Sequence, residues 1–180
     1  MSLTAAVPRP HGGELAAEFE ELFTEHYQLV YRTAYAVTGN RQDAEDVLQT
    51  IFLRLLRREV PPDIKTQPKR YLYRSAVNVA LNSVRNRRRQ RLTARLDEFD
   101  VAAPNAGPSP DEELQQDLVQ AVASLSPQIV EILVLRYEHD YSDAEIAKIL
   151  GKSRGVVAVT LFRARSRLRK LLAAPREKTK

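Results

Sequence analysis

The sequence predicts an all-α protein made of two small helical domains joined by a flexible linker. Three observations support this fold class. Apolar residues recur at three- and four-residue spacing in several long runs, helix-capping residues and prolines stand at the starts of these runs, and no segment alternates convincingly as a strand. At 180 residues with 43% hydrophobic content, the chain can build its cores without disulfides or metal.

Three helices are expected before the linker. Gly39 can end the first and Asn40 can cap the second, while Pro61 and Pro62 end the second. Pro68 then occupies the first position of a third helix, where its missing N–H costs nothing. The predicted spans are a disordered tail over 1–13, helices over 14–38, 41–58 and from 67 to 89 or beyond, and a first domain over 14–91.

Residues 92–110 are predicted to form the linker because they contain Pro104, Gly107 and Pro108 and show little apolar periodicity. Ser109 and Glu112 have the S-x-x-E spacing of a capping box and should start a helix that runs to about Ala123. Three more helices, one over 127–137 and two within 142–172, complete a second domain. The predicted spans are helices over 110–123 and 127–137, a second domain over 111–174 and a basic tail over 175–180.

The stretch 142–172 has the spacing of a helix-turn-helix. Ser142 and Glu145 form a second capping box, and Gly151 can take the left-handed conformation that ends a helix. Ser153 can cap the next helix almost at once. Two helices joined by so short a turn containing glycine form the unit that inserts its second helix into the DNA major groove.

The second helix of this unit has one apolar face and one basic face. The apolar stripe includes Val157, Leu161 and Ala164, which should face the core. The other face supports DNA binding, although an amphipathic helix with an ordinary solvated face is the alternative reading. The candidate DNA-binding residues here are Ser153, Arg154, Val156, Val159, Thr160, Arg163, Arg165 and Arg167.

The net charge of +5 conceals an alternating pattern along the chain. Residues 1–60 carry −3, residues 61–91 carry +8, residues 92–141 carry −8 and residues 142–180 carry +8. Two basic blocks separated by an acidic one suggest two separate contacts with a polyanion. Since the second basic block holds the helix-turn-helix, the first is a candidate for nucleic-acid binding as well.

The third helix, within the first basic block, carries a polar stripe opposite its apolar side. The stripe combines an aromatic ring, amides and guanidiniums, which supply stacking, base-edge hydrogen bonds and phosphate contacts. A solvated helix whose terminal arginines suit the helix dipole is the alternative, but five arginines in seven residues exceed that need. The candidates are Tyr71, Arg74, Asn78, Asn82, Arg85, Arg87, Arg88 and Arg89.

Three segments in this order resemble the extracytoplasmic-function sigma factors, the two-domain members of the bacterial sigma-70 family. They are Asp43-Ala44-Glu45-Asp46-Val47-Leu48-Gln49, Tyr71-Leu72-Tyr73-Arg74-Ser75-Ala76-Val77-Asn78, and residues 133–164. The resemblance covers roughly residues 15–172. It implies a subunit that joins core RNA polymerase and directs it to promoter DNA.

The resemblance also implies roles for particular residues. The helix over 41–58 resembles the contact with core polymerase, with Asp43, Asp46, Gln49 and Thr50 on its polar face. The helix that begins at Pro68 resembles the part that melts and reads the minus-ten element. The helix-turn-helix resembles the reader of the minus-thirty-five element. The implied partners are core RNA polymerase, promoter DNA and an anti-sigma factor, and we expect the free chain to be a monomer.

The recognition helix departs from the family pattern. Relatives usually read Gly-Thr-Val-Lys-Ser-Arg-Leu where this chain reads Gly155-Val156-Val157-Ala158-Val159-Thr160-Leu161. Valine and alanine can contact a thymine methyl but donate no hydrogen bond to a base edge. We therefore expect the second domain to hold DNA mainly through charge, with a relaxed or unusual upstream preference.

Enzymatic readings find little support. The sequence has no phosphate-binding G-x-x-x-x-G-K, no H-E-x-x-H and no cysteine, so no catalytic residue, cofactor or metal is predicted. His11, His26 and His139 are expected to be surface or edge residues. The absence of an apolar run of bilayer length indicates a cytoplasmic protein without membrane insertion. The rival functions are a helix-turn-helix regulator that acts without polymerase and a helical interaction module that binds RNA.

Overall fold

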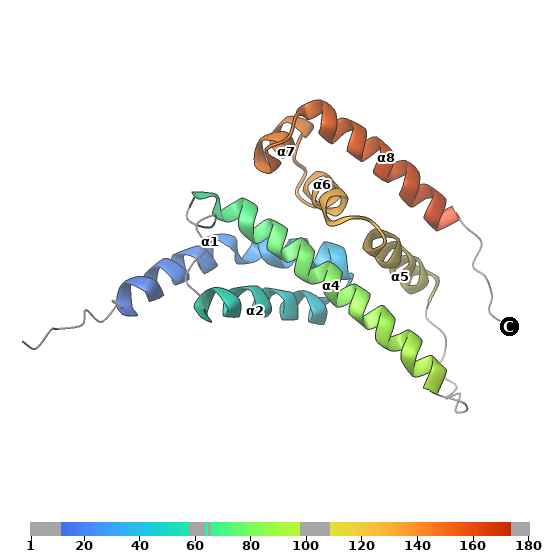
Figure 1. Ribbon diagram of the computed structural model, residues 1–180, viewed down its shortest axis with the longest axis horizontal. Coiled ribbons are helices and arrows are strands. Elements are labelled where there is room, and N and C mark those ends of the chain that lie inside the picture. The colour runs from blue at the N-terminus through green and yellow to red at the C-terminus, as the bar shows by residue number, and fades with distance from the viewer. Residues whose placement is uncertain (1–11, 58–63, 65, 98–108, 174–180) are drawn as a thin grey trace, which may run out of the picture.

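The computed structural model describes residues 12–57, 64, 66–97 and 109–173, and within these ranges it contains helices and no strand. The order of elements confirms the predicted fold class (Figure 1). The helices are α1 (Gly12–Thr38), α2 (Arg41–Arg57), α4 (Pro68–Asp97), α5 (Pro110–Ala123), α6 (Pro127–Tyr137), α7 (Asp143–Leu150) and α8 (Arg154–Ala173).

Helices α1, α2 and α4 pack together as an N-terminal bundle. Gly39 has a φ of 72°, which a side chain would strain, and this conformation turns the chain between α1 and α2. The Asn40 side chain accepts from the Asp43 backbone N–H at 2.8 Å and so caps α2 as predicted. The largest fully buried side chains of α4, Leu72, Tyr73 and Leu81, anchor the bundle core.

Helices α5 to α8 form a C-terminal bundle. Ser109 and Ser142 each make a complete capping box, with Glu112 and Glu145 respectively, so both predicted helix starts are confirmed. Helix α6 is apolar on almost every side and runs through the middle, where its residues 130 to 135 are all buried. Helix α8 packs across α5, α6 and α7.

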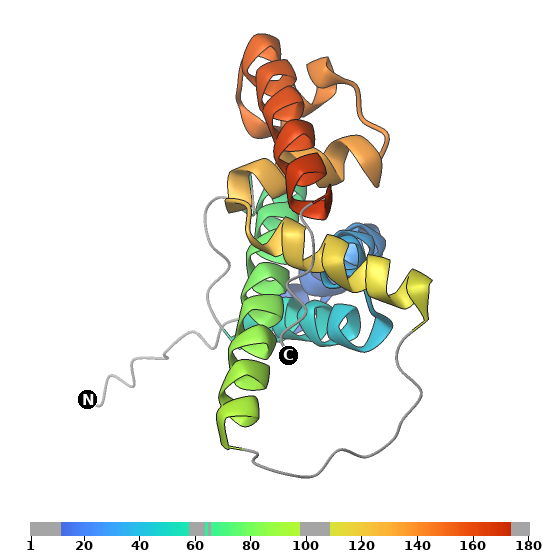
Figure 2. The same ribbon diagram turned by 90° about the vertical axis from the view of Figure 1, so that its right-hand side faces the viewer.

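The two bundles pack on each other and share one continuous apolar core. Helices α5 and α6 both contact α4 and α1. In Figure 2 the C-terminal bundle lies across one face of the N-terminal bundle, and α5 crosses over α4 and α1. The sequence predicted two domains and a linker but did not predict that the domains would pack against one another.

Some predicted boundaries and exposures differ from the structure. Helix α4 continues to Asp97 and so includes the first six residues of the expected linker, and α1 begins at Gly12. Leu56 lies four residues after Phe52, on the side of α2 that apolar spacing predicts to be buried, yet it is 57% exposed. His26, expected at the surface, is buried. The tails at 1–11 and 174–180 and the linker at 98–108 lie outside the described residues.

Candidate nucleic-acid interface

The polar stripe of α4 opens into a surface cavity of about 390 Å³. Asn78 and Asn82 are exposed, and Tyr71 is half-buried with its ring packed against the core. The three lie at helical spacing, which brings them to one side of α4 as predicted. The lining residues are Thr66, Gln67, Arg70, Tyr71, Arg74, Ser75 and Asn78.

Two arginines of the stripe are held by the C-terminal bundle. Arg74 pairs with Glu131 of α6, with 3.3 Å between Nε and Oε1. Arg85 donates from Nε to the Ala123 carbonyl at 3.0 Å and from Nη2 to the Leu125 carbonyl at 2.8 Å. The sequence placed both side chains correctly on the polar side of α4 but could not reveal these partners.

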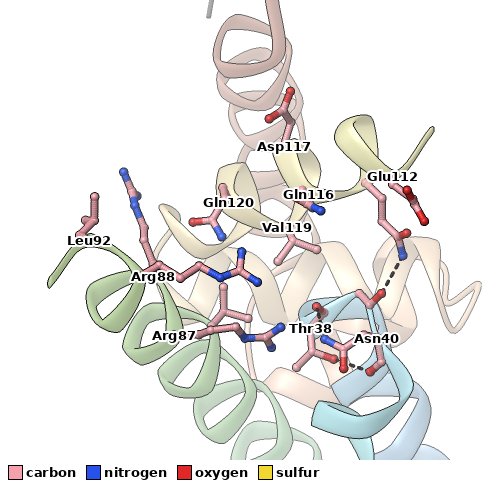
Figure 3. A pocket seen from close by; sticks show the side chains of 14 residues that line it. Thr38, Asn40, Arg87, Arg88, Leu92, Glu112, Gln116, Asp117, Val119 and Gln120 are labelled. Carbon is pink, nitrogen blue, oxygen red and sulfur yellow. Dashed lines mark hydrogen bonds between the residues drawn. The ribbon is translucent and has the colours of Figure 1, made fainter. Parts of the chain in front are cut away.

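The arginine-rich end of α4 lines a second cavity of about 470 Å³ between α4 and α5 (Figure 3). Arg87 forms an ion pair with Asp43 at the start of α2, and burial together with Arg91 lowers the Arg87 pKa. Arg88 is exposed, and the exposed Arg89 donates to Asn86 one turn before it. Positive charges are therefore concentrated at this end of α4, but the charge of Arg87 is already balanced by Asp43.

The predicted polymerase-binding residues divide into two environments. Asp46 and Gln49 are exposed on α2, and Thr50 beside them is half-buried. Asp43 instead accepts from Asn40 at 2.5 Å and pairs with Arg87, which leaves its side chain 19% exposed. Asp43 thus ties α2 to α4 in the structure.

Two leucines extend the exposed surface of α2. Leu53 and Leu56 are 47% and 57% exposed, and Leu53 lies one turn after Gln49. The apolar spacing of α2 predicts Leu56 on the buried side, and Leu53 is not among the predicted site residues. Leu53 falls outside the three- and four-residue spacing of the buried residues of α2. That spacing could have predicted that Leu53 is exposed.

The helix-turn-helix has the predicted geometry. Gly151 has φ 64° and ψ 41°, and its N–H bonds to the Ala147 carbonyl, which ends α7 in a left-handed cap. Ser153 accepts from the Val156 N–H at 3.3 Å and caps α8. Val157, Leu161 and Ala164 are buried, so the inner face of α8 is confirmed.

The outer face of α8 is exposed and mixed in character. Arg154, Arg163 and Arg167 are exposed, as are Val156 and Val159, while Thr160 is half-buried. Arg165 is also exposed, but its guanidinium lies 5.4 Å from the Tyr137 ring centroid and donates to the Tyr137 hydroxyl.

Phe162, which the sequence analysis did not select, is 74% exposed on the same helix. It lies three residues after Val159 and extends the exposed apolar positions along α8. Phe162 lies outside the buried stripe of α8 and one turn from Val159. This spacing could have predicted that Phe162 belongs to the exposed face.

Comparisons with known proteins agree with this arrangement. Residues 22–90 match the family model Sigma-70 region 2, and residues 115–168 match Sigma-70, region 4. The RNA polymerase sigma-E factor of Streptomyces coelicolor is 32% identical over 161 residues, which cover 87% of each chain. The chain belongs to the extracytoplasmic-function sigma factors of the sigma-70 family.

Among other sigma factors of this group, the ECF RNA polymerase sigma factor SigE of Mycolicibacterium smegmatis is 35% identical over 171 residues. The alignment covers 89% of this chain but only 65% of that relative's length. A solved structure of the sigma factor RpoE with the anti-sigma factor NepR, from Bartonella quintana, is 22% identical and covers 88% of this chain and 99% of that one, with a TM-score of 0.48.

Two further findings concern this sigma factor's described residues. None of its helices in that part of the chain is long and apolar enough to cross a membrane. The same residues contain no group of three or more His, Cys, Asp or Glu side chains that could hold a metal ion.

Proposed function

We propose that this protein binds core RNA polymerase, recognises promoter DNA and promotes transcription initiation. The observation that supports this most is the co-occurrence of both family regions with an intact helix-turn-helix and a polar cavity on α4. In this proposal residues 14–91 and 111–174 are the two functional domains, and residues 92–110 connect them.

The α4 cavity is proposed to receive an unstacked base of the non-template strand. Tyr71 offers a ring on which a base can stack, and Asn78 offers amide groups that can bond to a base edge. Arg70 and Arg74 on the same cavity supply positive charge for the backbone of that strand. Asn82 and Arg85, one and two turns further along α4, would follow the strand away from the cavity.

The helix-turn-helix is proposed to bind the upstream promoter element. Exposed Arg154, Arg163 and Arg167 would contact phosphates, which position a protein without reading sequence. Val156 and Val159 offer only methyl contacts to the groove, so a relaxed upstream preference is expected. The same apolar positions would also suit an anti-sigma factor, since an exposed apolar face of a helix is a frequent protein-binding surface.

The α2 surface is proposed to bind core polymerase. Asp46 and Gln49 stand exposed beside Leu53 and Leu56, so polar and apolar groups share one face. Exposed leucines next to directional polar groups have the composition of a protein interface. Asp43 contributes by holding α2 against Arg87 of α4, and Thr50 lies at the edge of the face.

Reconstituted transcription tests this function. The purified chain is mixed with core RNA polymerase and with genomic fragments of its host, and run-off transcripts are measured. Defined transcripts that are absent with core polymerase alone are expected. If the chain binds DNA but neither copurifies with core polymerase nor supports initiation, a helix-turn-helix regulator acting without polymerase becomes the better description.

A further inference from the structure

The cavity of about 470 Å³ between α4 and α5, the α4–α5 cavity, has a positively charged wall (Figure 3). Arg87, Arg88 and Arg91 line it from α4. Arg87 is paired with Asp43, whereas Arg88 and Arg91 form no ion pair with any residue that the structure describes. A guanidinium presents its N–H donors in a planar fork that matches the oxygens of a phosphate group. The α4 wall therefore offers the charges of Arg88 and Arg91 to an anion.

The opposite wall of the α4–α5 cavity, on α5, has a different chemistry. It combines carboxylates and amides with one apolar side chain, and its residues are Glu112, Gln115, Gln116, Asp117, Val119 and Gln120. A carboxylate repels a phosphate but accepts hydrogen bonds from N–H and O–H groups. A ligand that fits both walls is therefore anionic at one end and carries hydrogen-bond donors at the other.

Gln120 carries an acceptor on the α5 wall that lacks a partner. Its Oε1 is buried and makes no hydrogen bond within the part of the chain that the structure describes. Buried acceptors without a partner destabilise a protein and are rare in native structures. The terminal bond of a glutamine side chain rotates easily, so this oxygen can turn toward a donor in the cavity. The N–H or O–H group of a ligand would satisfy it.

The size and the apolar lining of the α4–α5 cavity indicate a ligand larger than a phosphate ion. Cavities of about 300–1,000 Å³ hold molecules of cofactor size. Val84 of α4 and Val119 of α5 supply apolar surface against which a flat ring can pack. A glutamine amide pairs with adenine by accepting from the N6 amino group and donating to N7. A phosphate and an amino-bearing purine in one molecule thus match the two walls.

We infer that the α4–α5 cavity is a binding site for a nucleoside phosphate, with the phosphate at Arg88 and Arg91 and an amino-bearing purine at Gln120. The site is distinct from the cavity on the polar stripe of α4 and goes beyond the proposed function. Neither Arg91 nor Gln120 is among the residues proposed to bind DNA, so both can be changed without altering that surface. Adenosine 5′-monophosphate carries both of the required groups and serves as the probe.

Calorimetric titration of the full-length chain with adenosine 5′-monophosphate tests the site. The reference ligands are inorganic phosphate, adenosine, and purine riboside 5′-monophosphate, which lacks only the 6-amino group. Adenosine 5′-monophosphate should bind about tenfold more tightly than each of them, because each lacks the base, the phosphate or the donor for Gln120.

Two variants and two matched controls locate the binding. Arg91→Ala and Gln120→Leu should each weaken adenosine 5′-monophosphate binding about tenfold, and Gln120→Leu should also remove the preference over purine riboside 5′-monophosphate. Arg169→Ala on α8 and Gln128→Leu on α6 change exposed residues of the same types outside the cavity, so both should bind like the wild type. Without ligand, Gln120→Leu should be at least as stable as the wild type in urea, because leucine removes the unpartnered oxygen. That result separates lost binding from lost folding.

Several outcomes would overturn the inference. Adenosine 5′-monophosphate that does not bind would do so, and inorganic phosphate that binds as tightly would reveal an adventitious ion site only. Equal affinities for the two purine nucleotides would show that Gln120 does not read the base. Loss of binding in Asn78→Ala but not in Gln120→Leu would place the nucleotide in the polar cavity of α4 instead. Run-off transcription tests the proposed function separately, so failure of either one is distinguishable from failure of the other.

Discussion

Arg74 of α4 and Glu131 of α6 form an ion pair across the contact between the two bundles, although their environments differ sharply. The Glu131 side chain is 5% exposed, whereas that of Arg74 is 50% exposed. Burial raises the pKa of Glu131, and the nearby Arg74 guanidinium opposes that rise. The carboxylate is therefore costly to keep charged and depends on its partner.

Arg74→Ala should lower the free energy of unfolding by about 1–3 kcal/mol, because it leaves a buried carboxylate without its cation. Glu131→Leu should be close to neutral, since it removes the charge along with its need for a partner. Urea unfolding at neutral pH measures both. The Arg74→Ala deficit should shrink as the pH falls, because protonated Glu131 needs no cation. Equal stability of Arg74→Ala and wild type at neutral pH would contradict this account.

His139 should make the packed arrangement sensitive to mild acid. Burial lowers its pKa below the ordinary 6.5, with the positive charges of Arg32 and Lys69 acting in the same direction and Glu138 and Asp140 opposing them. Its Nε2 lies 3.0 Å from the Thr33 hydroxyl of α1. Protonation of His139 is thus disfavoured while the bundles are packed. The contribution of neutral His139 to the free energy of unfolding is therefore lost as the pH falls below about 6.5.

The measurement is urea unfolding of the wild type and of His139→Gln between pH about 7.5 and about 5.5, the range in which histidine titrates. The wild type should lose more stability over this range than the variant. Parallel pH profiles would show that His139 does not carry the effect.

Asp46→Arg with Gln49→Ala should abolish binding to core polymerase while the helical fold survives. Both side chains are exposed on α2, so the fold does not depend on them, whereas a reversed charge inside an interface costs several kcal/mol. Copurification with core polymerase measures binding, and circular dichroism checks the fold. A folded double variant with unchanged affinity would show that this face of α2 is not the contact.

Asn78→Ala with Asn82→Ala should reduce open-complex formation on duplex promoters more than on pre-melted ones. Both amides are exposed on the polar side of α4, where they can hold separated bases but contribute little to packing. Permanganate footprinting on matched duplex and bubble templates makes the comparison. An equal loss on both templates would instead indicate a packing role.

Arg163→Ala should weaken binding to all upstream sequences alike, because a phosphate contact carries no sequence information. Val159→Lys should change the ranking among upstream sequences, because it places a donor where the wild type offers only methyl groups. Competition binding against a panel of upstream duplexes tests both. For the wild type, affinity should fall by about 0.9 log units per log of salt for each phosphate neutralised. Strong discrimination at several single base positions by the wild type would contradict relaxed readout.

Local signals predicted most of the helices. The capping boxes at Ser109 and Ser142 and the glycines at 39 and 151 act within a few residues, so the sequence displays them directly. The buried side of α8 followed from its three- and four-residue spacing in the same way. These features depend on residues close together in the sequence and not on how the helices pack against one another.

The packing between the bundles could not be predicted by the same reasoning. Arg74 meets Glu131 and Arg85 meets the Ala123 carbonyl across dozens of residues, and periodicity within a helix gives no information about its partner. The Asp43–Arg87 pair likewise joins two helices whose relative placement the sequence pattern leaves open. The exposure of Leu56 has the same cause, because the spacing of apolar residues does not show whether another helix covers them near a helix end.

Helix α4 also fixes a length. It is one uninterrupted helix of 30 residues, and the rise from Tyr71 to Arg88 is about 26 Å at 1.5 Å per residue. On DNA this corresponds to the rise of about seven or eight base pairs at 3.4 Å each. A continuous helix of that length would hold the cavity and the arginine-rich end at a fixed distance, and in this sense it would act as a ruler. Deleting one residue between them would shorten the ruler by about 1.5 Å and rotate its far end by about 100°, so that both the spacing and the angular phase of the two contacts would change at once.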